Sequence, residues 1–174
     1  MPTTADDVTS AALHEASRVL NQCVLKIGHC LEQLSEEQVW WRPHESMNSI
    51  GNLILHLTGN VRQWMVSGIG GHPDVRIRSA EFAERGPIPK ARLLAGLQEV
   101  VSETADAFRR ATAADMLQPR VIQGYTVTGW GALFSCVPHF NGHTQEIICT
   151  TRMQLKERYR FLDLAARARD QRAL

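Results

Sequence analysis

Hydrophobic residues recur at steps of three and four along four stretches of the chain, and each stretch predicts an amphipathic helix. In chain order, these stretches cover residues 10–34, 50–65, 89–108 and 130–153. There is no alternation of strand and helix signals and no internal repeat. The pattern predicts an all-α, antiparallel four-helix bundle.

Residues that favour helix ends lie next to these stretches. Asn48 or Ser49 is suited to cap the second helix, and Thr128 the fourth. Ser35 begins a sequence, S-E-E-Q, with the spacing of a capping box, which predicts a short helical turn. The Arg42-Pro43 pair ends that turn, because proline disfavours helix at the residue before it.

Two connections lack helical periodicity. About twenty residues separate Gly70 from Pro89, and a connection of that length in a compact domain is usually functional or mobile. The segment Arg120–Val127 is the one stretch that reads as extended, which predicts a small hairpin or an irregular loop before the fourth helix.

Length and charge narrow the choice of function. A chain of 174 residues suits one domain, with an expected core at about 10–155 and a charged tail at 156–174. The net charge is +1, so a nucleic-acid partner is not expected. The polar N-terminus and the absence of a long apolar run predict a cytoplasmic protein without a membrane partner. The tail arginines alternate with acids and are interpreted as a solvated helix face: Arg158, Arg160, Arg167, Arg169 and Arg172.

Four cysteines lie in apolar-periodic segments without metal-ligand spacing, and they predict buried, reduced thiols: Cys23, Cys30, Cys136 and Cys149. A catalytic cysteine needs an activating neighbour. Cys136, three residues before His139, comes nearest to that condition.

Seven histidines occur, and two of them, His139 and His143, are four residues apart in the fourth helix. Side chains at this spacing share a helix face, with Cβ atoms about 5–6 Å apart. Such a pair can bind one metal ion, although a pair of this kind also arises by chance in a histidine-rich chain.

A helical wheel adds a third histidine. His139 and His143 border the apolar sector of the fourth helix, and His56 borders that of the second. Three imidazoles with space left for water are the ligand count of an open, catalytic metal site, for which zinc or nickel is expected. Three polar residues share the same borders and are expected to orient rings or water: Asn52, Asn60 and Glu146.

Two segments around the histidines are characteristic, "NSIGNLILHLTGNVRQW" and "HFNGHTQEI", and between them lies "GIGGHPDVRIRSAEFAERGPIP". These segments and their separation resemble the DinB/YfiT-like superfamily of bacterial four-helix bundles. The resemblance is strongest to a branch of unknown function. The resemblance covers residues 10 to about 155. It implies a divalent metal held by His56, His139 and His143. It also implies thiol-dependent transferase or isomerase chemistry with a low-molecular-weight thiol, and a homodimer.

Two residues depart from the family pattern. Pro138 immediately precedes the first ligand of the fourth helix, and a proline in a helix removes a hydrogen bond and introduces a kink. Glu146 stands where relatives often carry glutamine. It is interpreted either as an added ligand or base, or as a solvated surface carboxylate.

Two hypotheses from different classes remain open. The first is a metal-dependent transferase, isomerase or hydrolase in which the metal activates a thiol or water. The second is a non-catalytic metal- or ligand-binding bundle in stress response or detoxification. In the first, arginines of the long connection, Arg76, Arg78 and Arg85, contact an anionic thiol or substrate, although three solvated arginines are an alternative. Four tryptophans, more than a modest core needs, also favour a homodimer: Trp40, Trp41, Trp64 and Trp130.

Overall fold

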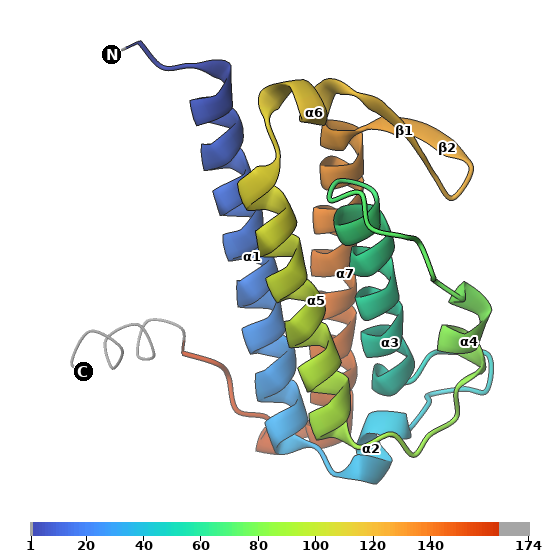
Figure 1. Ribbon diagram of the computed structural model, residues 1–174. Coiled ribbons are helices and arrows are strands. Elements are labelled where there is room, and N and C mark those ends of the chain that lie inside the picture. The colour runs from blue at the N-terminus through green and yellow to red at the C-terminus, as the bar shows by residue number, and fades with distance from the viewer. Residues whose placement is uncertain (1, 164–174) are drawn as a thin grey trace.

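Four long helices pack side by side in the computed structural model, which describes residues 2–163 (Figure 1). They are α1 (Ala5–Gln33), α3 (Ile50–Val61), α5 (Lys90–Arg110) and α7 (Gly129–Leu155). The predicted all-α four-helix bundle is confirmed. Of the predicted charged tail, residues 164–174, with Arg167, Arg169 and Arg172, lie outside the described residues.

Shorter elements join the long helices. They are α2 (Glu36–Trp40), the π-helical segment η1 (Arg62–Ser67), α4 (Arg78–Ala83), α6 (Ala113–Leu117), the strands β1 (Pro119–Ile122) and β2 (Tyr125–Thr128), and the 3₁₀ turn η2 (Lys156–Arg158). Within residues 2–163, no helix is both long and apolar enough to cross a membrane.

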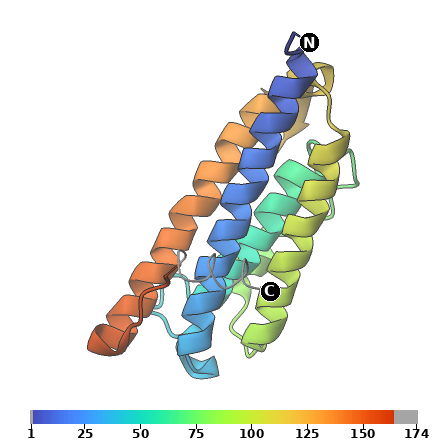
Figure 2. The ribbon, with the colours of Figure 1, turned by 90° about the vertical axis from the view of Figure 1, so that its left-hand side faces the viewer.

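The long connection between α3 and α5 returns along the side of the bundle instead of making a tight turn (Figure 1). As a result α3 and α5 run in the same direction. The Arg62–Glu103 ion pair, 2.5 Å between Nη1 and Oε2, joins the start of η1, directly after α3, to the later part of α5. α1 and α7 both run the opposite way, as the view in Figure 2 also shows. The bundle is therefore antiparallel between α3 and α7 but parallel between α3 and α5.

The predicted helix ends agree with the observed caps. The side chains of Ser35, Ser49 and Thr128 each accept a hydrogen bond from the backbone three residues on. α1 starts five residues earlier than its apolar pattern predicts, because Thr4 and Asp7 form a capping box that supports an additional polar turn.

The fourth long helix continues through Pro138, which lies on its exposed side. A proline is tolerated there because neighbouring turns hold the helix on both sides, and the face that carries Phe140 and Ile147 is buried in the core. His139 and His143 therefore keep their i, i+4 relation on one helix.

The extended segment before α7 is a two-stranded antiparallel hairpin, with Pro119 opposite Thr128 and Ile122 opposite Tyr125. Gln123 and Gly124 connect the strands with φ of 54° and 81°. Two residues in the left-handed region are what a tight hairpin of this twist requires. The hairpin is held against the end of η1 by Arg120, which donates to the Gly68 carbonyl at 2.6 Å.

Most of the tryptophans are buried or half-buried in the bundle. Trp64 is buried, and Trp40 and Trp130 are half-buried against the core, whereas Trp41 is 42% exposed. The predicted homodimer stays a prediction, with Trp41 the tryptophan most open to a partner.

Phe140 and Phe134 provide a matched test of the core, because both lie on α7 and their exposed fractions are 0% and 73%. We expect Phe140→Ala to lower the free energy of unfolding by about 3–5 kcal/mol, since it leaves a cavity. Phe134→Ala should change it by less than about 0.5 kcal/mol. Urea unfolding followed by circular dichroism measures both, and equal effects would contradict this assignment of the core.

Candidate metal centre

The three histidines singled out in the sequence lie together in the structure. His56 comes from α3, and His139 and His143 come from the facing part of α7. One nitrogen of each ring lies within 4.8 Å of the others. The Nε2 atoms of His56 and His139 are 3.0 Å apart, and the ring centroids of His139 and His143 are 4.5 Å apart.

The cluster has a buried side and an open side. His56 is 5% exposed, whereas His139 and His143 are half-buried. The pKa of His139 is lowered to about 4, mainly by burial and further by repulsion from His143 and His56. His139 is therefore neutral at pH 7, which is the form that binds metal ions.

Glu81, in α4, makes the most important contact with a ring of the cluster. Its Oε2 lies 3.0 Å from Nδ1 of His56, and both side chains are buried. A carboxylate on Nδ1 fixes the imidazole tautomer and leaves Nε2 available as a ligand, an arrangement common among metal-binding histidines. We did not predict Glu81 from the sequence. The only signal was the unusual length of the connection that contains it.

Arg76 holds the Glu81 carboxylate from the other side. Its Nε donates to Oε1 at 2.7 Å and its Nη2 to Oε2 at 2.8 Å, so the pair is bidentate. Burial opposes ionisation of Glu81, but hydrogen bonds from Arg76 and His56 outweigh it and keep the pKa of Glu81 below its usual value. The carboxylate is thus ionised, and both of its oxygens accept hydrogen bonds.

A glycine in α3 makes room for this pair. A Cβ atom built on Gly59 would overlap Oε1 of Glu81 and approach Nε of Arg76 at 3.1 Å. The absence of a side chain there lets the carboxylate lie directly on the helix surface next to His56. The small residue in "HLTGN" is thus part of the geometry of the site.

The three polar residues predicted to support the cluster have different positions. Glu146 accepts from Nδ1 of His143 at 2.7 Å, so it contacts a ring of the cluster. Asn60 instead accepts a hydrogen bond from the Cys136 thiol at 3.4 Å.

Asn52 is bonded to the backbone of α4 and to Ser49 and Arg42, and not to an imidazole. Its Nδ2 donates to the carbonyls of Glu81 and Glu84 at 2.8 and 3.0 Å. It therefore holds the backbone of α4 against the first turn of α3, and acts on His56 only through the position of Glu81.

The predicted buried state of the cysteines is confirmed for Cys23, Cys30 and Cys136 and is wrong for Cys149, which is exposed. Cys149 lies two residues after the buried Ile147, so it is on the opposite side of α7. Burial raises the pKa of Cys136 to about 12. The one cysteine near the histidines in sequence is therefore a protonated, enclosed thiol.

The donor set fits a divalent metal ion. Two of the three rings have a carboxylate on Nδ1, which directs their Nε2 atoms away from the carboxylates, and all three are close enough to share one ion. No cysteine joins them, and the ring of Phe82 closes one side, with its centroid 4.9 Å from that of His56.

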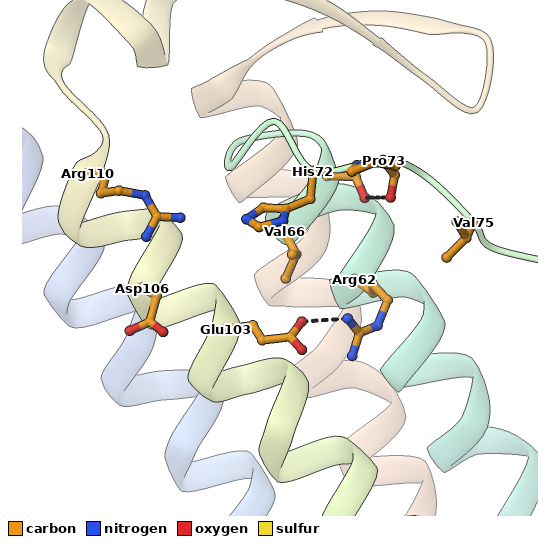
Figure 3. A pocket seen from close by; sticks show the side chains of 9 residues that line it. Arg62, Val66, His72, Pro73, Val75, Glu103, Asp106 and Arg110 are labelled. Atoms are coloured by element: carbon orange, nitrogen blue, oxygen red, sulfur yellow. Dashed lines mark hydrogen bonds and ion pairs between the residues drawn. The ribbon is translucent and has the colours of Figure 1, made fainter.

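A separate cavity of about 470 Å³ lies between η1, the residues after it and α5 (Figure 3). The Arg62–Glu103 ion pair forms one wall, and His72 and Arg110 extend from the connection and from α5. None of the three histidines lines this cavity. We therefore assign it no part in the chemistry of the cluster.

A family model described as "Protein of unknown function (DUF1572)" matches residues 7–168. No curated protein matches the chain at a significant level.

Solved structures show the same fold at low sequence identity. A conserved protein from Enterococcus faecalis has a TM-score of 0.68 at 14% identity, covering 80% of this chain and 94% of its own. A DinB-like protein from Bacillus subtilis has a TM-score of 0.63 at 14% identity, with 84% and 96% covered. A DinB-like protein from Bacillus cereus has a TM-score of 0.59 at 16% identity, with 76% and 85% covered. The predicted resemblance to DinB-like bundles is confirmed.

The cysteine environments lead to a prediction about labelling. In the folded protein we expect Ellman's reagent at pH 8 to modify Cys149 rapidly, because it is exposed. Cys136 should remain unmodified until the protein is unfolded, because a pKa of about 12 leaves about one thiolate in ten thousand. In Cys149→Ser the rapid phase should disappear. Rapid modification of Cys136 in that variant would show that the thiol is accessible and activated.

Proposed function

The chain belongs to the DUF1572 family of proteins of unknown function, and we propose that it is a metal-dependent enzyme of the DinB-like superfamily. The observation that carries this proposal is the group of three imidazoles from α3 and α7, which can hold a metal ion and which is buried on one side and open on the other.

In this proposal His56, His139 and His143 hold one zinc or nickel ion, since imidazole suits both. The bound ion supplies a Lewis acid that lowers the pKa of a thiol or water. Glu81 keeps His56 in the tautomer whose Nε2 faces the other rings, and Glu146 does the same for His143. These contacts orient the ligands before the ion arrives.

The nucleophile in this proposal comes from outside the chain. Cys136 is enclosed, and its raised pKa keeps it protonated. Cys149 lies on the exposed side of α7, two residues from the buried Ile147. A low-molecular-weight thiol or a water molecule at the open side is then the reacting group, and the reaction class is thiol-dependent transfer or isomerisation, or hydrolysis.

We expect the purified protein to bind about one divalent ion per chain, and His56→Ala to weaken that binding strongly. Glu81→Gln should weaken it about 10–100-fold, the usual effect of removing a carboxylate behind a metal-binding histidine. Zinc and nickel affinities by competition with a chromogenic chelator, together with elemental analysis, give both values.

His72→Ala and Glu84→Gln are suitable controls for these variants, because neither side chain contacts the cluster. Both should keep the affinity of the unmodified protein. A His56→Ala/His139→Ala double variant that retains its full metal content would show that the ion, if any, is bound elsewhere.

Catalysis is tested by turnover of a model electrophile, such as 1-chloro-2,4-dinitrobenzene, with a small thiol. We expect the zinc- or nickel-loaded protein to accelerate the reaction, and the metal-free protein and His139→Ala to lose the acceleration. Ester hydrolysis should be measured in parallel, because the proposed reaction class includes hydrolysis. A protein that binds metal in the three-histidine site but catalyses neither reaction would favour the alternative, a non-catalytic metal- or ligand-binding bundle.

A further inference from the structure

The three arginines of the long connection differ in how their charges are used. The Arg76 guanidinium is buried and bonded to both oxygens of Glu81. Arg85 donates from Nη1 to the backbone carbonyls of Phe82 and Glu84, at 2.8 and 3.0 Å. The donors of Arg76 are therefore committed to Glu81 and, through Nη1 at 2.9 Å, to Gln63, and Arg85 stabilises the end of α4.

Arg78 differs from both. It is exposed at the start of α4, and within residues 2–163 its guanidinium has no hydrogen bond or ion pair. Its Cζ lies 4.8 Å from the centroid of the Phe82 ring, a cation–π contact. The same ring lies against His56, with centroids 4.9 Å apart. The Phe82 ring thus contacts both the Arg78 guanidinium and one ring of the histidine cluster.

Two acidic and two basic side chains lie around the cluster: Glu81, Glu146, Arg76 and Arg78. Glu81 is paired with Arg76, and Glu146 accepts a hydrogen bond from His143, so neither carboxylate is paired with Arg78. A divalent ion would add further positive charge at the same place.

We propose that Arg78 is a specificity-determining residue that binds a carboxylate of the small molecule occupying the open side of the histidine cluster. This inference rests on the proposed metal site and names the substrate class for it. An arginine presents a planar fork of donors that matches a carboxylate. One unpaired guanidinium matches the single charge of a carboxylate, whereas a phosphate dianion would need the donors that Arg76 and Arg85 already use.

The test compares two thiols that differ mainly in one group, 3-mercaptopropionate and β-mercaptoethanol. Each is titrated into the cobalt-loaded protein, and the sulfur-to-cobalt charge-transfer band gives its dissociation constant. We expect 3-mercaptopropionate to bind about 10-fold more tightly, the effect of one charge-assisted hydrogen bond at an exposed position. In Arg78→Gln this preference should disappear, while the affinity for β-mercaptoethanol and for cobalt stays the same.

Arg85→Gln is the matched control, because it removes the same charge from the same connection. It should keep the preference for 3-mercaptopropionate, and Arg78→Lys should keep part of it. Equal binding of the two thiols to the unmodified protein, or an unchanged preference in Arg78→Gln, would overturn the inference.

A second experiment distinguishes a failure of thiol binding from a failure of the proposed role of Arg78. If neither thiol produces the band, propionate is titrated into the cobalt-loaded protein by calorimetry. Binding of propionate that is lost in Arg78→Gln would support the role of Arg78 and reject only the thiol as reactant. No binding of propionate would overturn the role of Arg78 as well.

Discussion

A buried carboxylate needs cationic or hydrogen-bonding partners, and the connection between α3 and α5 is organised around that need. Glu81 lies against the surface of α3, where Gly59 leaves space for it, and is bonded by Arg76 and His56. Leaving a buried charge without its partner costs several kcal/mol, on the order of 3–5 kcal/mol in measured cases. The connection is thereby held to the bundle at the point where the histidines meet, and this one ion pair links the fold to the candidate site.

The direction of the helices follows from the same connection. A short turn after α3 would have made α5 antiparallel to it, whereas the observed connection returns along the bundle and starts α5 beside the beginning of α3. The returning chain passes His56 and places three side chains beside it: Arg76, Glu81 and Phe82. Asn52 completes the arrangement, because its amide holds the carbonyls of α4.

The candidate site combines a rigid part and an open part. Two helices supply the imidazoles, and helices hold side chains in more exact positions than loops do. Carboxylates on His56 and His143 orient their rings, and the enclosed thiol of Cys136 leaves the reacting group to come from outside. Arg78, exposed at the start of α4, adds a positive charge that lies on the Phe82 ring beside His56. These features support the proposed metal ion and the proposed binding of a small, negatively charged molecule.

By itself the sequence determined the four helices, their caps and the three histidines, because these depend on local spacing. Apolar steps of three and four decide which face of a helix is buried, and His139 and His143 share a face whatever lies nearby. Glu81 could not be found in this way. It lies 25 residues from His56 in a segment without periodicity, and only packing of that segment on α3 brings the two together. The tertiary structure likewise decided that Asn52 holds the backbone of α4, that Arg76 is paired with Glu81, and that Arg78 has no ion pair within residues 2–163. Which arginine is paired depends on contacts between distant segments, and local spacing carries no information about them.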